Sequence, residues 1–226
     1  MQKLTKPLDL VESVKTSLFD AILTGTLLPG EKLQQEKLAE MLGVSRQPVS
    51  HALRILADQG ILTGLNSKSL TVAELDQTKM MQIFEVRAEL DSYAAKLAAQ
   101  RSANNEFTPE DHETIDRLHD HVNYNMVVGN LEVNRSVRDD IDFHELIRKL
   151  SGNPYIHDTL APHLLHHYRL IYLSISNKAQ EIWTEHANIL NAILDGDELQ
   201  ARSLVREHIS GTARRLQVYW NSLNHG

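Results

Sequence analysis

Apolar residues recur at helical spacing along most of the chain, and the pattern divides the chain into two parts. In the first part, amphipathic helices are predicted over 8–23, 38–42 and 45–60, followed by short strands over 61–63 and 70–72. Beyond residue 73 the spacing is helical throughout. The predicted helices there cover 77–101, 108–128, 131–150, 154–176 with a kink at Pro162, 179–194 and 198–223. Six helices without a strand pattern predict an all-α bundle.

A tight turn joins the second and third helices of the first part. Gly43-Val44-Ser45 lets the next helix start at a steep angle, and the Ser45 hydroxyl is expected to cap that helix. Pro48 is tolerated in the first turn, whose donors lack helical partners. An ordinary helical hairpin with a solvated polar face is the alternative, but this turn favours a helix-turn-helix.

The polar face of the helix after the turn carries side chains suited to base edges and phosphates in a major groove. They are Arg46, Gln47, Ser50, His51 and Arg54. Lys68 lies at the tip of the loop between the two strands, as in a wing, and is either a phosphate contact or a solvated lysine. We therefore expect a mainly α chain, with a winged helix-turn-helix DNA-binding domain over 1–75 and an all-α helical bundle over 76–226.

Composition limits the possible classes of protein. The chain has 226 residues, 42% of them hydrophobic, which is enough for buried cores in both parts. No apolar run approaches the ~20 residues of a membrane span, and the start of the chain lacks the pattern of an export signal. The absence of cysteine excludes disulfides and thiolate chemistry. We expect a cytoplasmic protein without a membrane partner.

Charge and histidine are distributed unevenly. Residues 1–72 hold 8 basic and 7 acidic residues, for a net charge of +1, whereas residues 73–226 hold 15 and 23, for −8. DNA contact is therefore expected only in the first part. Eleven of the twelve histidines lie in the second part.

One Asp and three His of the second part have spacings suited to a metal site. Asp140 and His144 are four residues apart and share a helix face. His186 lies ten residues before Gly196 and His208 twelve after it, so in an antiparallel hairpin both stand roughly 15 to 18 Å from the turn. Such a set suits a divalent ion such as Zn²⁺, Ni²⁺ or Mn²⁺. The alternative is that these histidines lie at the surface or are hydrogen-bonded in the core.

Other polar residues of this part are given no ligand role. His163, His166 and His167 are interpreted as polar surface, because no carboxylate partner is evident. Asp139 and Asp142 lie on other faces than Asp140 and are expected to be solvated or to support the ligands from behind.

Residues 8–75 resemble the winged-helix domain of GntR-family transcriptional regulators. The resemblance is carried by Pro29-Gly30-Glu31-Lys32-Leu33, Leu42-Gly43-Val44-Ser45-Arg46 and Pro48-Val49. That family usually has Arg where Ser50 stands and Gly where Ser69 stands. The operator preference of close relatives is therefore not carried over to this chain.

Residues 78–220 resemble the FCD effector-binding domain of the FadR-like GntR subfamily. The matching motifs are Phe84-Glu85-Val86-Arg87, Asp140-x-x-Phe143-His144, Ser151-Gly152-Asn153, Glu185-His186 and His208. The resemblance implies that the Asp and the three His hold a metal. It also makes Arg87 a candidate partner for an anionic effector, because a guanidinium grips a carboxylate bidentately. The alternative for Arg87 is an ion pair with Asp91 on the same helix.

Together these features predict a homodimeric, ligand-responsive transcriptional regulator, and not an enzyme. A small organic acid would bind the metal and Arg87 and release a repressor from its roughly palindromic double-stranded DNA operator. Two alternatives remain open. One is a regulator that senses the metal itself, and the other is a metal-dependent hydrolase, for which the sequence shows no obvious general base.

Overall fold

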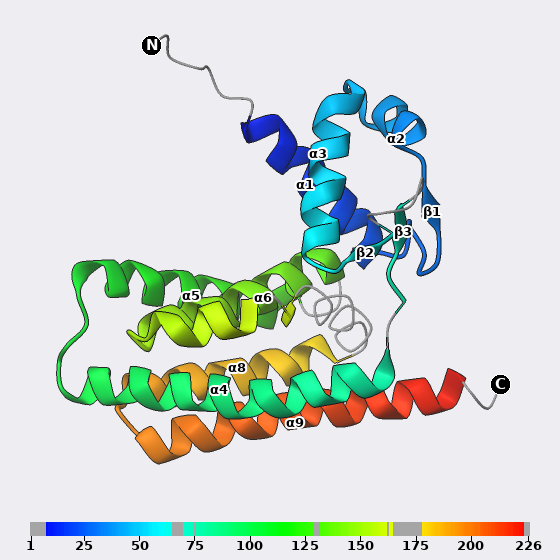
Figure 1. The fold of residues 1–226 in the computed structure, drawn as a ribbon. Helices are drawn as coiled ribbons and strands as arrows, with labels where there is room; N and C mark the ends of the chain where they lie inside the picture. Colours follow the sequence, from blue (N-terminus) through cyan, green and yellow to red (C-terminus); the bar gives the residue numbers. More distant parts are fainter. Residues whose placement is uncertain are drawn as a thin grey trace, which may run out of the picture. The chain divides into compact units, whose positions relative to one another are not determined.

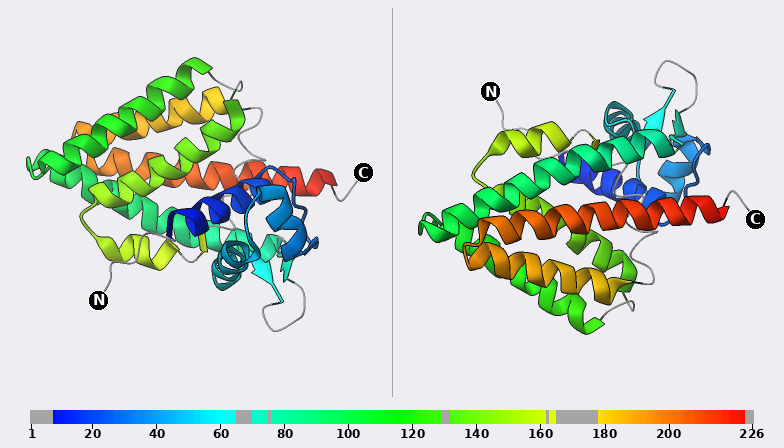
Figure 2. Two further views of the ribbon diagram at one scale, coloured as in Figure 1. Left: turned by 90° about the horizontal axis from the view of Figure 1, so that it is seen from above. Right: turned by 90° about the horizontal axis from the view of Figure 1, so that it is seen from below.

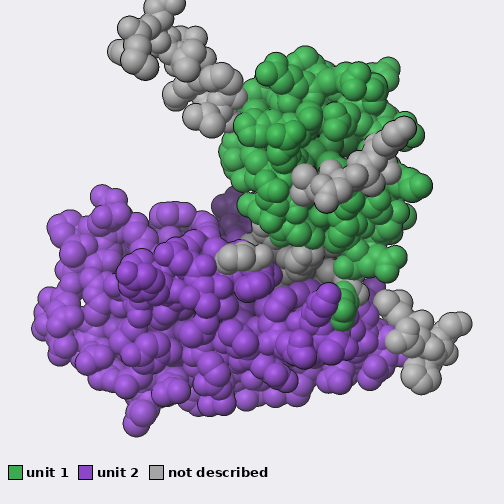
Figure 3. All heavy atoms as spheres, viewed as in Figure 1, with its two compact units in different colours: residues 1–76 green, residues 77–226 purple. Residues whose placement is uncertain are grey.

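The structure of the chain, a computed structural model, describes residues 8–64, 70–74, 76–128, 132–161, 163–164 and 178–223 (Figure 1). The chain forms two compact units, Met1–Asp76 and Gln77–Gly226 (Figure 3). Within the described ranges, no helix is both long and apolar enough to cross a membrane.

The Met1–Asp76 unit combines three helices with short strands. Its elements are α1 (Leu8–Leu23), β1 (Lys32–Leu33), α2 (Gln35–Leu42), α3 (Arg46–Asp58), β2 (Leu62–Thr63) and β3 (Leu70–Val72). The helices α1 and α2 both pack on α3, whose Val49, Ala52 and Leu53 are fully buried. The amphipathic face predicted for this helix is therefore the centre of the unit's core.

The sheet of this unit contains one strand more than the sequence pattern predicts. Its order is β1-β3-β2 with antiparallel pairs, and Lys32 lies opposite Thr71 while Leu62 lies opposite Val72. The additional strand, β1, has two residues and is defined only by its pairing with β3. A segment that short carries no alternation that could be recognised in the sequence.

The turn before α3 forms as predicted, but one detail differs. Gly43 ends α2 in the left-handed conformation with φ of +65°, which glycine adopts without steric cost. Ser45 occupies the N-cap position of α3, yet its side chain makes no capping hydrogen bond, so the expected cap is wrong. Its hydroxyl is exposed, and solvent can satisfy the first donors of the helix instead.

The Gln77–Gly226 unit is helical in all of its described elements. These are α4 (Gln77–Ala103), α5 (Pro109–Val128), α6 (Val133–Leu150), a helical segment at 154–161 and 163–164, α8 (Ala179–Leu194) and α9 (Glu198–Leu223). The predicted kink at Pro162 and the end of that helix lie outside the described residues. The prediction of a winged helix-turn-helix followed by an all-helical domain is confirmed.

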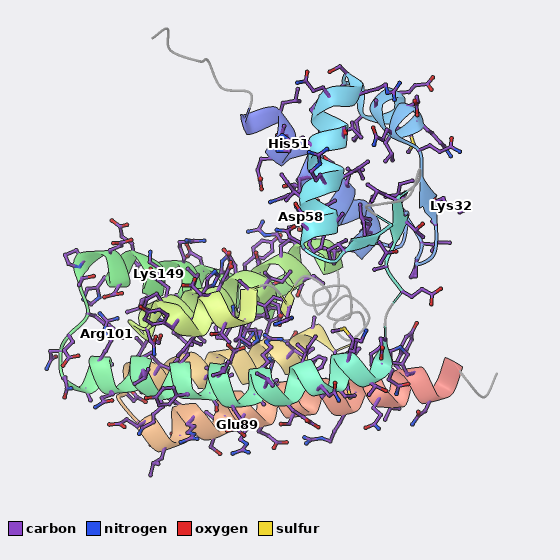
Figure 4. All side chains as sticks on the ribbon, in the orientation of Figure 1. Lys32, His51, Asp58, Glu89, Arg101 and Lys149 are labelled. Carbon is purple, nitrogen blue, oxygen red and sulfur yellow. The ribbon has the colours of Figure 1, made fainter. Side chains whose placement is uncertain are left out.

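The long helix α4 is the centre of this bundle. It packs along α9, which lies beside it in Figure 2, and it also contacts α6 and α8. Ala94, Ala95 and Ala98 of α4 are fully buried, and side chains this small let neighbouring helices approach closely. At one end of α4, Arg101 (labelled in Figure 4) donates to the carbonyl of Leu150 at the end of α6.

Candidate functional site

Four buried side chains converge in the core of the helical bundle. Asp140 and His144 come from α6, His186 from α8 and His208 from α9, and one potential ligand atom of each lies within 4.8 Å of the others. The Nε2 atoms of His144 and His186 are 3.2 and 3.3 Å from His208 Nε2. Asp140 Oδ1 is 3.4 Å from His186 Nε2. The structure thus brings together all four residues that the sequence singled out.

Two local features of the sequence produce this convergence. The i, i+4 spacing stacks Asp140 and His144 on one face of α6. The turn around Gly196 makes α8 and α9 an antiparallel pair, which sets His186 level with His208. Gly196 has φ of +72°, and a Cβ there would lie 2.9 Å from the Cβ of Ala103, so this turn requires glycine.

The hydrogen-bonding capacity of these groups fits a cation. Glu185 Oε2 lies 2.6 Å from His208 Nδ1, which places the proton of a neutral His208 on Nδ1 and leaves its Nε2 a lone pair. The Nε2 atoms of His144 and His186 both face this lone pair. Each neutral imidazole carries only one proton. The ring protons are therefore too few to form a hydrogen bond in every close contact among the three imidazoles and the Asp140 carboxylate. Three imidazole nitrogens and one carboxylate oxygen are also the donor set of Zn²⁺ sites.

The electrostatics of the cluster favour the protonation states that metal ligands need. Burial lowers the pKa of His144 and His186 well below 6.5, and the positive charge of Arg87 acts in the same direction. Both rings are therefore neutral near pH 7, as ligands must be. Burial raises the pKa of Asp140, while the positive charge of Arg87 opposes the rise. A bound cation would favour the ionised carboxylate.

Aromatic and acidic neighbours hold the imidazoles in place, a role that the sequence analysis did not predict for them. Phe143 stacks on His186 with 4.1 Å between ring centroids, and Trp183 forms a T-shaped contact with the same His186 ring. Glu185 precedes His186 in the chain, but its contact with His208 depends on how α8 packs on α9. Such supporting groups orient ligands and tune their basicity.

Arg87 forms the ion pair that the sequence analysis gave as its alternative role. Its Nε donates to Asp91 Oδ2 at 2.9 Å, and both side chains are 2% exposed. Asp91 also accepts from Arg148 Nε at 2.6 Å. Arg148 was not predicted as part of the site, although it lies one turn beyond His144 on α6. The cluster therefore continues into a buried Arg-Asp-Arg group.

The polar residues to which the sequence analysis gave no ligand role are not part of the four-residue cluster, and two of them lie outside the described residues. His163 is exposed, whereas His166 and His167 lie outside the described residues. Asp139 is buried rather than solvated and accepts from Asn125 Nδ2 on α5 at 2.6 Å. Asp142, the more exposed of the two carboxylates, pairs with Arg117 and His121 of α5.

The predicted DNA-contacting residues of α3 meet at one hollow of about 550 Å³ in the Met1–Asp76 unit. The hollow is lined by Gln35, Arg46, Gln47, Ser50, His51 and Arg54. His51 can be followed on α3 in Figure 4. The guanidinium of Arg46 pairs with Glu36 of α2 at 2.9 Å, and both side chains are largely exposed. Lys68 lies outside the described residues.

Comparison with known proteins assigns both units. Residues 10–72 match the gntR family of bacterial regulatory proteins, and residues 82–211 match the FCD domain. The HTH-type transcriptional regulator YdhC of Bacillus subtilis is 25% identical over an alignment of 220 residues that covers 95% of this chain and 94% of that protein. The Nta operon transcriptional regulator of Aminobacter aminovorans is 27% identical, with 80% and 82% covered.

A solved structure has the same fold. The structure of E. coli McbR/YncC superposes with a TM-score of 0.74 at 22% identity, covering 96% of this chain and 100% of that one. These families and relatives are transcriptional regulators rather than enzymes, so the hydrolase alternative is wrong. The chain belongs to the GntR family of bacterial transcriptional regulators, and it is a DNA-binding regulator of the FadR-like type with a C-terminal FCD domain.

Proposed function

We propose that this regulator is a homodimeric repressor whose helical unit binds a divalent metal ion and a small carboxylate effector. The observation that carries the proposal is the buried cluster of one Asp and three His, whose ligand atoms lie within 4.8 Å of one another. Nitrogen and carboxylate donors in this number accept Zn²⁺, Ni²⁺ or Mn²⁺. Four protein ligands leave coordination positions open on an ion that takes five or six.

In this proposal, the bound ion supplies Lewis acidity and an open position for a carboxylate oxygen. Asp140, His144, His186 and His208 hold the ion. Arg87 contributes a buried positive charge close enough to lower the pKa of His144 and His186, which supports its role as a partner for the acid. Its pairing with Asp91 keeps that charge fixed in position.

The same proposal assigns DNA contact to the hollow on α3. Arg46, Gln47, Ser50, His51 and Arg54 would lie near bases and phosphates, with Lys68 at the backbone or minor groove. Two copies of the unit would contact the two halves of a roughly palindromic operator. The effector would release the protein only if it binds more tightly to an arrangement of the two units that does not fit the operator.

The test is the metal content of the purified full-length protein, compared with an Asp140→Ala, His144→Ala double variant and with His163→Ala, which changes an exposed histidine. We expect about one ion per subunit in the wild type and in His163→Ala, and none in the double variant. A wild-type protein that purifies without metal and takes none up on dialysis against Zn²⁺ would refute the metal site.

Operator affinity of the metal-loaded and metal-stripped protein then separates the two remaining regulatory schemes. If metal alone changes the affinity, with no organic acid present, the ion itself is the effector. If metal alone leaves it unchanged and a carboxylate lowers it only in the loaded protein, the repressor scheme stands.

A further inference from the structure

An acidic side chain borders the surface that the proposal assigns to DNA. Glu36 lies in the first turn of α2, and its Oε1 is 2.9 Å from Nη2 of Arg46, the first residue of α3. The two helices contact each other, as Figure 1 shows. Arg46 lines the hollow on α3, and Gln35, which precedes Glu36, lines it from α2. A carboxylate is therefore held at a surface expected to face phosphates.

Both partners of this ion pair are attached to backbone that the core of the unit holds in place. Leu38 and Ala39 of α2 are buried, and so is Val49 of α3. The turn between the helices is closed by Gly43 in the left-handed conformation. The core thus sets the relative position of the two backbones, and the carboxylate can fix the direction of the guanidinium.

Stability does not account for the pair. The side chains of Arg46 and Glu36 are 65% and 66% exposed, and ion pairs exposed to this extent contribute little to the free energy of folding. Glu36 also weakens the attraction between this surface and DNA, because its negative charge is repelled by the phosphates. The consequence of the pair therefore lies in how it presents Arg46.

A guanidinium held in this way suits a base edge better than a phosphate. The contact with Glu36 takes one of its five N–H donors, and the same plane still offers two donors for O6 and N7 of a guanine. A phosphate attracts the net charge of a side chain, and the carboxylate of Glu36 cancels that charge. Bidentate hydrogen bonds to a base depend on direction, which the pair fixes.

We propose that Glu36 positions Arg46 to read a guanine of the operator and reduces the attraction of Arg46 for phosphates, so that the pair sets sequence discrimination. This inference rests on the proposed DNA contact of α3 and is independent of the metal and effector site. Glu36 is thereby a positioning residue, which acts on the DNA through Arg46. Without the carboxylate, Arg46 would turn to a phosphate, and binding would become tighter on any sequence and less selective.

The test uses the full-length protein and a duplex that the wild type selects from random sequence. Anisotropy titrations at several salt concentrations compare this duplex with copies in which each G·C pair in turn is replaced by A·T. We expect Glu36→Gln to lower the discrimination at one guanine at least about fivefold, and to steepen the salt dependence of binding by about one unit. Glu40→Gln, which removes the same charge from an exposed position one turn further along α2, should retain the wild-type discrimination.

A second pair of variants shows whether Glu36 acts through Arg46. Arg46→Lys keeps the charge but lacks the planar fork, so it should lose discrimination at the same guanine. In this background Glu36→Gln should cause no further loss, because no guanidinium remains to be positioned. A merely structural role of Glu36 would instead lower the melting temperature and add its effect to that of Arg46→Lys.

Three results would overturn the inference, and they differ in what else they remove. Discrimination that survives Glu36→Gln would show that Arg46 needs no carboxylate partner. Equal losses in Glu36→Gln and Glu40→Gln would show that only net charge matters. In both cases the proposed DNA contact of α3 would stand. Wild-type discrimination at every position in Arg46→Lys would refute, in addition, the proposed contact of Arg46 with the bases.

Discussion

Arg148 of α6 and Asp91 of α4 form a buried ion pair, with 2.6 Å between Arg148 Nε and Asp91 Oδ1. Asp91 also accepts from Arg87, and the two guanidinium groups hold the pKa of Asp91 below its usual value although burial opposes them. A single carboxylate therefore ties two helices together one turn from His144. The stability of the bundle and the charge of the candidate site depend on the same residue.

Asp91→Ala should lower the stability of the protein strongly. Removing the carboxylate leaves two guanidinium groups buried without their shared counter-charge, at a cost of about 3–5 kcal/mol. Urea unfolding measures the effect. Glu89→Ala, which removes an exposed partner of Arg206 on the same helix, should change the free energy of unfolding by less than about 1 kcal/mol. Equal losses of unfolding free energy in the two variants would show that the buried ion pair contributes no more to stability than the exposed one.

Glu185→Gln should weaken metal binding without unfolding the bundle. The Glu185 carboxylate lies 2.6 Å from His208 Nδ1, and loss of such a partner typically lowers metal affinity about 10- to 100-fold. Competition with a chromogenic chelator measures the affinity. Glu181→Gln, on the exposed start of the same helix, is the control. An unchanged affinity would mean that Glu185 does not orient the ligand.

Mild acid should destabilise the metal-free protein. Burial holds the pKa of His144 and His186 well below 6.5, so below that pH the unfolded chain binds more protons than the folded one. The free energy of unfolding then falls as pH drops, by about 1.4 kcal/mol per pH unit for each histidine. Asp140 acts in the opposite direction, but only as the pH approaches its own raised pKa.

Urea unfolding in the presence of a chelator, at about pH 7.5 and about pH 5.5, measures this slope. His163→Gln, at an exposed position, should retain the wild-type slope, and a His144→Gln, His186→Gln double variant should reduce it. A wild-type stability that does not change over this range would contradict the buried, neutral state of the two rings.

Arg54→Ala should weaken DNA binding. If Arg54 contacts a base, discrimination at that position should fall by about 1–3 kcal/mol, and if it contacts a phosphate, the salt dependence of binding should decrease by about one unit. Anisotropy titrations on a duplex selected from random sequence, at several salt concentrations, distinguish the two. Lys15→Ala on α1, which also removes one positive charge, should leave both quantities nearly unchanged.

Gly196→Ala should destabilise the α8–α9 turn more than Gly25→Ala destabilises the end of α1. Both glycines have positive φ, at +72° and +75°, so both variants incur about 1–2 kcal/mol of backbone strain. Only at Gly196 would the new Cβ also collide with Ala103, whereas Gly25 has open space around it. The difference between the losses of melting temperature in the two variants measures the effect of the collision with Ala103. Equal losses would show that the turn can shift to relieve this collision.

The amphipathic pattern by itself determined the order of the described helices and the faces they bury. It also identified the four metal-site candidates, because i, i+4 spacing and equal distance from a turn are properties of single helices and of one hairpin. The polar face of α3, with its candidate DNA-contacting residues, was likewise predicted from helical spacing alone. These features depend on the local period of the backbone, which the sequence shows directly.

Only the tertiary structure decided which faces meet. Strand β1 exists through its pairing with β3, nearly forty residues later in the chain. Asp91 and Arg148 are 57 residues apart, and Glu185 and His208 are 23 apart on different helices. Periodicity specifies the direction in which a side chain points from its own helix, but the packing of a second helix chooses its partner. The buried Arg-Asp-Arg group and the support of His208 by Glu185 therefore emerge only when the bundle is assembled.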